Sequence, residues 1–142
     1  MKKIAMMATL ALGLCFSMPG FSQTAAAVKH HAVVPLNTAE GPEWEMMLHH
    51  VENLQTALKD EGGVEVEIVF YGPGLSMLLK SDTKHAAALK KLSDAGVKMA
   101  ACQNAMKFLK VTSADLPAYA FEVNAGVAEV VRKQTAGWSF LP

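Results

Sequence analysis

Cys102 is the residue of this chain best suited to nucleophilic chemistry. It follows a short apolar run, residues 97–101, and begins a stretch with helical spacing. Apolar positions of that stretch are Cys102, Ala105, Met106 and Leu109. A thiol at the start of a helix lies near free backbone N–H groups and the positive end of the helix dipole, which favour the thiolate form. Because the thiolate is the nucleophile, this position suits sulfur transfer.

The same spacing supports a second interpretation, in which Cys102 belongs to a hydrophobic core. Cysteine behaves as a small hydrophobe and is among the residues most often buried. Cys102 is in phase with Met106 and Leu109 and would begin the apolar stripe of their helix. The spacing leaves both interpretations open.

The first residues predict an export signal. Two lysines precede an uncharged apolar run over residues 4–18, which a Pro-Gly pair then breaks. A positive start, an apolar run and small residues in that order are typical of a secretory signal peptide. We expect residues 1–22 to be removed, with cleavage after Ala27 as the alternative. Residues 23–142 would then form one domain in the periplasm, without a membrane anchor.

Export changes the meaning of the cysteine count. The chain has two cysteines, and Cys15 falls within the predicted signal, so the exported domain would carry Cys102 alone. A disulfide within the domain is then impossible. An odd thiol in an oxidising compartment indicates a reactive group or an intermolecular partner.

Composition restricts the class of protein. The chain has 142 residues, of which 51% are hydrophobic and 18% are charged, and its formal net charge is zero. This length supports one domain with its own core. Nucleic-acid binding usually requires a basic surplus or a basic stripe, and neither is present, so we expect no nucleic-acid partner.

Strand-like and helix-like segments alternate after residue 30. The expected strands are residues 30–36, 64–71, 97–101, 119–123 and 138–141. The expected helices are residues 42–59, 83–95, 102–110 and a last one after Asn124, whose apolar face would carry Val127, Val130, Val131 and Gln134. Parallel strands joined by helices bury both faces of their sheet. We therefore predict an α/β fold, a three-layer α/β/α sandwich with a mostly parallel sheet of about five strands in an undetermined order.

Ligands of open α/β sheets bind outside the carboxyl ends of the strands. Three predicted loops lie there, at Asn37, at Gly72-Pro73-Gly74 and at Cys102. We expect the helix start at Gln103 and Asn104 to stabilise negative charge on the sulfur and the glycine loop to shape the pocket. This loop lacks the lysine and hydroxyl residue of a phosphate-binding loop.

Metal binding has one candidate set of residues. Met99, Cys102 and Met106 offer the soft sulfur ligands that Cu(I) prefers. Methionine at core spacing more often fills a core, so our principal expectation is that the protein holds no metal. The histidine pairs at residues 30–31 and 49–50 diverge on a strand or helix and do not form a chelating pair alone.

Three stretches resemble the DsrE/DsrF-like family of sulfur-relay proteins. They are a strand and glycine loop at residues 66–75, a strand that ends in cysteine with asparagine two places on at residues 96–106, and a last helix and strand at residues 126–138. The resemblance covers nearly all of residues 30–142 through the order and spacing of these stretches. It implies a five-stranded α/β/α fold and assembly into homo-oligomers such as trimers or hexamers.

The resemblance also implies a role for Cys102. In the sulfur-relay members, the matching cysteine receives sulfur as a persulfide and passes it on. We therefore expect a periplasmic sulfur carrier, closer to a carrier than to a turnover enzyme, that needs no cofactor and exchanges sulfur with donor and acceptor proteins. The alternative is a non-catalytic periplasmic module that binds a small ligand or Cu(I), with Cys102 as a structural residue or a ligand.

Overall fold

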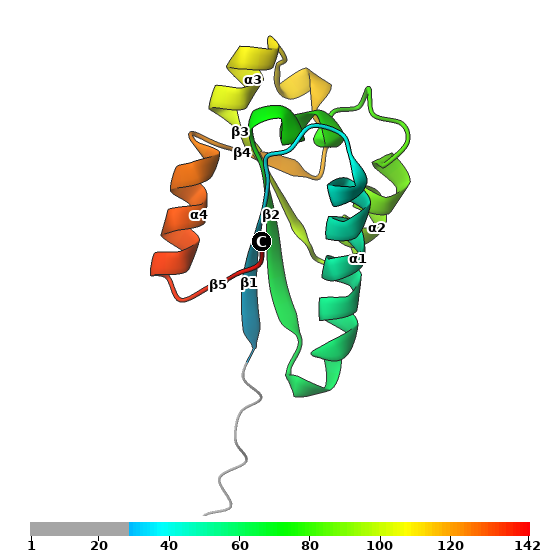
Figure 1. Ribbon diagram of the computed structural model, residues 1–142, viewed down its shortest axis with the longest axis vertical. Coiled ribbons are helices and arrows are strands. Elements are labelled where there is room, and N and C mark those ends of the chain that lie inside the picture. The colour runs from blue at the N-terminus through cyan, green and yellow to red at the C-terminus, as the bar shows by residue number, and fades with distance from the viewer. Residues whose placement is uncertain (1–28) are drawn as a thin grey trace, which may run out of the picture.

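The computed structural model describes residues 29–142 (Figure 1). The predicted signal peptide and Cys15 lie outside this range. The described residues form a five-stranded sheet in the order β4-β3-β2-β1-β5, and every pair of neighbouring strands is parallel. The strands are β1 His30–Leu36, β2 Val64–Phe70, β3 Lys98–Cys102, β4 Ala120–Val123 and β5 Ser139–Phe140.

Helices cover both faces of the sheet. The α-helices are α1 Pro42–Ala57, α2 Ala86–Asp94, α3 Gln103–Leu109 and α4 Gly126–Thr135. Short 3₁₀ segments occupy Lys59–Glu61, Gly72–Leu78 and Ser113–Asp115. Helices α1 and α2 lie on one face and α4 lies on the other (Figure 1). The predicted three-layer α/β/α sandwich is confirmed. Within residues 29–142, no helix has both the length and the apolar character needed to cross a membrane.

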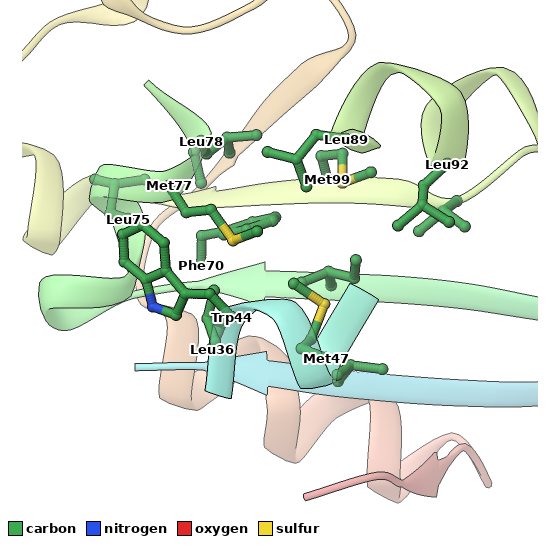
Figure 2. Packing of buried hydrophobic residues seen from close by; sticks show 14 of the residues in the cluster. Leu36, Trp44, Met47, Phe70, Leu75, Met77, Leu78, Leu89, Leu92 and Met99 are labelled. Carbon is green, nitrogen blue, oxygen red and sulfur yellow. The ribbon is translucent and has the colours of Figure 1, made fainter. Parts of the chain in front are cut away.

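The larger core lies between the sheet and helices α1 and α2 (Figure 2). Helix α1 contributes side chains at helical spacing, namely Trp44, Met47, Leu48 and Val51. Alternate residues of the strands, such as Ile68 and Phe70, meet them from the sheet. A continuous stripe of this kind fixes both the helical conformation and the face that is buried, and the helix predicted there is present.

The core on the α4 side is much smaller. It consists of Val33, Val69, Ala100, Val123 and Val130, with Tyr71 and Trp138 packed against them. Only one of those residues, Val130, belongs to α4. Few apolar contacts therefore hold this helix on the sheet.

Helix α4 turns a different face to the sheet than the sequence predicts. Val127 and Val131 are 60% and 61% exposed, and Gln134 is also exposed. The buried residues are Gly126 and Val130. The prediction was right for Val130 and wrong for the other three residues. The buried stripe begins at Gly126, which has no side chain and therefore adds no hydrophobicity to the pattern.

The parallel strands bring the loops that follow them to one edge of the sheet. Strand β3 ends at Cys102, and the register pairs Cys102 with Val123, the last residue of β4. The segment between β4 and α4 therefore begins beside Cys102. This arrangement places the start of α4 at the carboxyl edge, where ligands of such sheets bind.

Candidate functional site

Cys102 occupies the junction between β3 and α3. It is the last residue of the strand and the N-cap of the helix, with extended backbone angles of φ −75° and ψ 115°. Its side chain is a free thiol, and the residue is 5% exposed. The predicted position at a strand end and a helix start is therefore present.

The sulfur of Cys102 is held by the start of a second helix. The backbone N–H of Gly126 donates a hydrogen bond to Sγ, with an N···S distance of 3.1 Å. Gly126 is the first residue of α4, so this N–H is one of the donors that a helix leaves without an intrahelical partner. Within the described residues no side chain caps α4, and the sulfur occupies the capping position. The dipole of α4 favours negative charge at that point.

Glycine at position 126 permits this contact. A Cβ atom there would lie 2.6 Å from the Cβ of Tyr71, far inside contact distance. The start of α4 therefore approaches the sheet as closely as a backbone can. A larger residue would push the helix start outward and carry its N–H away from Sγ.

A cavity of about 260 Å³ adjoins the sulfur. Its lining consists of Tyr71, Gly72, Cys102, Asn104, Ala105, Phe108, Ala125, Gly126 and Val127. Phe108 is 82% exposed, so the cavity reaches the molecular surface. The lining residues offer backbone N–H groups and an amide side chain but include no carboxylate. Cys102 is thus nearly buried in the apo protein and also borders a space that a second sulfur atom could enter.

Two of the predicted pocket residues accompany Cys102. Gly72 and Asn104 both line its cavity. Gly72 has a φ of 51°, a left-handed conformation that suits glycine, and it lies just beyond the end of β2, after Tyr71. The predicted convergence of the β2 and β3 loops is therefore present at these two residues.

The other predicted pocket residues lie apart from this cavity. Asn37 borders a separate hollow near the start of α1, and Pro73 borders another beside Trp44. Gly74 packs on the backbone of Leu36, where a Cβ would come within 2.3 Å of the carbonyl oxygen. The glycine loop thus contributes Gly72 to the cavity, while Gly74 serves packing against β1.

Gln103 also points elsewhere. Its side-chain amide donates a hydrogen bond to Glu122 Oε2 at 2.9 Å, and Ser113 donates one to the other oxygen. These hydrogen bonds, first from Ser113 and then from Gln103, lower the pKa of the Glu122 carboxyl. Gln103 therefore joins α3 to the β4 side of the edge and does not line the Cys102 cavity.

The candidate copper ligands are part of the packed core. Met99 lies in the larger core near Leu89 (Figure 2), and the same cluster of buried residues includes Cys102 and Met106. Met106 is buried, and neither methionine lines the cavity at Cys102. Residues 29–142 also contain no cluster of three or more His, Cys, Asp or Glu side chains that could hold a metal ion.

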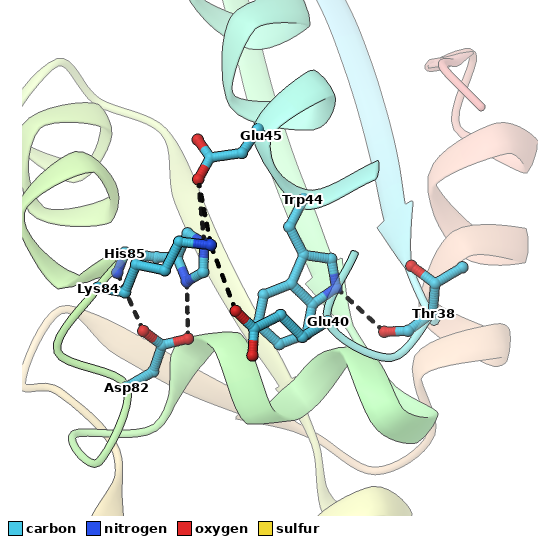
Figure 3. A network of polar contacts seen from close by, with 7 residues as sticks. All are labelled: Thr38, Glu40, Trp44, Glu45, Asp82, Lys84 and His85. Atoms are coloured by element: carbon cyan, nitrogen blue, oxygen red, sulfur yellow. Dashed lines mark hydrogen bonds and ion pairs between the residues drawn. The ribbon is translucent and has the colours of Figure 1, made fainter. Parts of the chain in front are cut away.

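A second polar cluster lies at the start of α1 (Figure 3). His85 Nδ1 is 2.8 Å from Asp82 Oδ2, and the His85 backbone N–H donates to Asp82 Oδ1 at 3.0 Å. The other ring nitrogen lies 3.4 Å from Glu45 but has no hydrogen-bond partner among the described residues. Trp44 meets the His85 ring edge-on and donates to the Thr38 carbonyl at 3.1 Å. None of these residues lines the Cys102 cavity, and the cluster fastens α1 to the loop before α2.

Sequence reasoning missed the most informative partner of Cys102. Gly126 and the aromatic residues Tyr71 and Phe108 were not predicted as site residues. One signal could have found Gly126, because the loop after the fourth predicted strand belongs to the same carboxyl edge as the other three loops.

Comparisons with known proteins give a family and a solved structure of similar fold. The family model described as DsrE/DsrF-like family matches residues 15–142. A solved structure of a protein of unknown function, MTH1491 from Methanobacterium thermoautotrophicum, is similar with a TM-score of 0.75 and 26% sequence identity; the match covers 80% of this chain and 98% of that chain. No curated protein matches.

Proposed function

The chain belongs to the DsrE/DsrF-like family, and on that basis we propose that it is a sulfur carrier that holds sulfur as a persulfide on Cys102. Family membership indicates a role of the sulfur-relay type. The observation that carries the finer proposal is the hydrogen bond from the Gly126 N–H to Sγ. It gives the sulfur a fixed donor and a helix dipole, and both favour an anionic sulfur nucleophile.

The proposed reaction is a transfer of one sulfur atom between thiols. The Cys102 thiolate attacks the outer sulfur of a donor persulfide, R–S–SH. A new S–S bond forms on Cys102, the donor S–S bond breaks, and the donor thiolate leaves with the bonding electron pair. The proton on the transferred sulfur can pass to that thiolate. No net oxidation occurs, and an acceptor thiolate removes the sulfur by the same step.

The cavity suits the loaded state. Its volume of about 260 Å³ leaves room for an outer sulfur beyond Sγ. A persulfide is more acidic than a thiol. The loaded group therefore carries negative charge at neutral pH. The absence of a carboxylate among the lining residues avoids repulsion, and the amide donors at the start of α4 offer attraction.

Location and assembly belong to the proposal as well. The export pattern at residues 2–20 supports a periplasmic carrier. Two apolar side chains that line the cavity, Phe108 and Val127, are exposed, and Phe121 of β4 and Val131 of α4 are exposed as well. Such side chains support contact with another protein surface, either a second copy in a homo-oligomer, such as the trimers or hexamers that the resemblance implies, or a sulfur donor or acceptor protein.

Intact mass spectrometry tests the proposed function. The exported form is exposed to inorganic polysulfide beside a Cys102→Ser control. A gain of one or more sulfur atoms that a reductant reverses, and that the control lacks, is the expected result. No gain on folded protein, together with a thiol that resists alkylation, would reject the carrier role. Cys102 would then be a core residue of a binding module.

A further inference from the structure

The interface between α4 and the sheet contains a buried charge pair. Glu67 of β2 is 1% exposed, and its Oε2 lies 2.6 Å from the Lys133 ammonium of α4. Lys133 also lies 3.8 Å from Glu129 and 4.2 Å from the centre of the Trp138 ring. The second Glu67 oxygen, Oε1, is buried with no hydrogen-bond partner in the described chain.

The stability of the fold does not by itself explain why an ion pair is buried at this interface. Burial raises the pKa of the Glu67 carboxyl, although the Lys133 ammonium beside it acts in the opposite direction. The site thus disfavours the charge that it contains. Well-packed apolar residues commonly cover such an interface as well as a buried ion pair does, or better. A short bond between charged groups adds what apolar contact lacks, a fixed distance and direction.

The pair lies on the same stripe of α4 as the residue that contacts Cys102. Lys133 follows Gly126 by seven residues, which is about two helical turns and returns to the same face. Tyr71, the extended residue directly after β2, follows Glu67 by four positions, and this even spacing places both on one face of the sheet. Helix α4 therefore rests on the sheet at two ends, with Gly126 against Tyr71 and Lys133 on Glu67.

Apolar packing does little to fix the helix between those ends. Val130 is the one buried apolar side chain that α4 contributes to the described core. A single small contact permits a helix to rotate or slide. The charge pair at its far end restricts both movements.

We propose that Glu67 and Lys133 are positioning residues for Cys102, because their bond fixes the seating of α4 and thereby holds the Gly126 N–H on the sulfur. The inference rests on the proposed function for its purpose, since it concerns how the sulfur nucleophile is kept in its reactive form. The structural part of the inference is that this buried pair affects the reactivity of a distant thiol. That part is tested without any sulfur transfer.

The neighbouring charges supply a matched control. Lys98 of β3 lies in register with Glu67 and pairs with Glu65, on the same face of the sheet. That pair joins strand to strand and does not involve α4. Glu129 is engaged by Arg132 at 2.8 Å within the helix. Lys98 also acts on the Glu67 charge through space, more weakly than Lys133 does. Lys98→Met therefore removes positive charge from this face without removing a contact of α4.

The experiment measures the alkylation rate of Cys102 by iodoacetamide across a range of pH. We expect Lys133→Met and Glu67→Gln to slow alkylation at neutral pH by about two- to five-fold, the size of a helix-terminus interaction with a charge. Lys133→Arg keeps the positive charge and should keep the wild-type alkylation profile. Lys98→Met should also leave this profile unchanged.

Hydrogen exchange at the Gly126 amide gives a second readout. We expect protection of this amide in the wild type and in Lys98→Met, and reduced protection in Lys133→Met. If a single variant fails to fold, the double variant Glu67→Met/Lys133→Leu keeps the interface covered and takes its place. Unchanged alkylation profiles and unchanged Gly126 protection in folded variants would overturn the inference. Failure of the wild type to take up sulfur from polysulfide would instead reject the proposed function, because the alkylation comparison needs no persulfide.

Discussion

The backbone N–H of Gly126 lies 3.1 Å from the Sγ of Cys102, although the two residues are 24 positions apart in the chain. The thiol therefore sits at the starts of two helices, as the N-cap of α3 and as a hydrogen-bond acceptor for α4. Helix α3 is short, and its contribution follows from the chain itself. The contribution of α4 depends on tertiary packing, so changes to that packing should alter the chemistry of the sulfur.

Gly126→Ala should disturb the site directly. The added Cβ would lie 2.6 Å from Tyr71, so the start of α4 must move. We expect slower alkylation of Cys102, less sulfur loading from polysulfide, and a loss of about 1–3 kcal/mol in the free energy of unfolding from overpacking. Alkylation kinetics, mass spectrometry and urea unfolding measure these effects. Val131→Ala, at an exposed position later in the same helix, is the control, and equal behaviour of the two variants would contradict the prediction.

Glu67 should make the protein less stable as the pH rises. Its pKa in the folded state is raised above the ordinary value of 4.5, chiefly by burial. Between the two values the folded state binds more protons than the unfolded state, so the free energy of unfolding falls with rising pH. Urea unfolding at a series of pH values above 4.5 should show this slope in the wild type and a smaller slope in Glu67→Gln. Parallel curves would contradict the prediction.

Asp82 should contribute in the opposite sense. Burial alone would raise its pKa, but hydrogen bonds from the His85 backbone and ring outweigh burial, and the pKa lies below the ordinary 3.8. The stabilisation is complete above pH 3.8 and is lost as the pH falls through the folded-state value. Asp82→Ala leaves the buried His85 ring without this partner and should cost about 1–3 kcal/mol near neutral pH.

The measurement for Asp82 is urea unfolding beside a control at an exposed pair. Asp94→Ala removes a carboxylate that contacts Lys90 at the surface of α2, and it should change stability by less than about 1 kcal/mol. The difference between wild type and Asp82→Ala should shrink as the solution is made more acidic. A difference that stays constant with pH would show that Asp82 acts without its charge.

Periodicity predicted the parts of this fold that bury large apolar surfaces. The stripe of Trp44, Met47 and Val51 gave α1, and the apolar run before Cys102 gave β3 to within one residue at each end. Parallel strands present the loops that follow them at one edge of the sheet. This rule also predicted that Gly72 and Asn104 would lie near Cys102, and both line its cavity.

Other features leave no periodic signal. Gly126 has no side chain, and Lys133 is charged, so nothing in the pattern marks them as the buried stripe of α4. The strand order depends on which edges pair, and β5 has two residues, too few to indicate its place beside β1. The hydrogen bond to Sγ joins two loops through the sheet register, which is a property of the assembled sheet.

Phe108 should matter for contact with other molecules and hardly at all for folding. Its side chain is 82% exposed at the edge of the Cys102 cavity, and it lies near other exposed apolar residues of α4. Because little of the ring is buried within the chain, Phe108→Ser should change the free energy of unfolding by less than about 0.5 kcal/mol. If the proposed homo-oligomer uses this surface, the substitution should shift sedimentation-equilibrium profiles toward the monomer. Phe140→Ser, at an exposed aromatic on the opposite edge strand β5, is the matched control. If both variants assemble as well as the wild type does, the interface lies elsewhere. The Phe108 side of the cavity would then be accessible to a sulfur donor or acceptor.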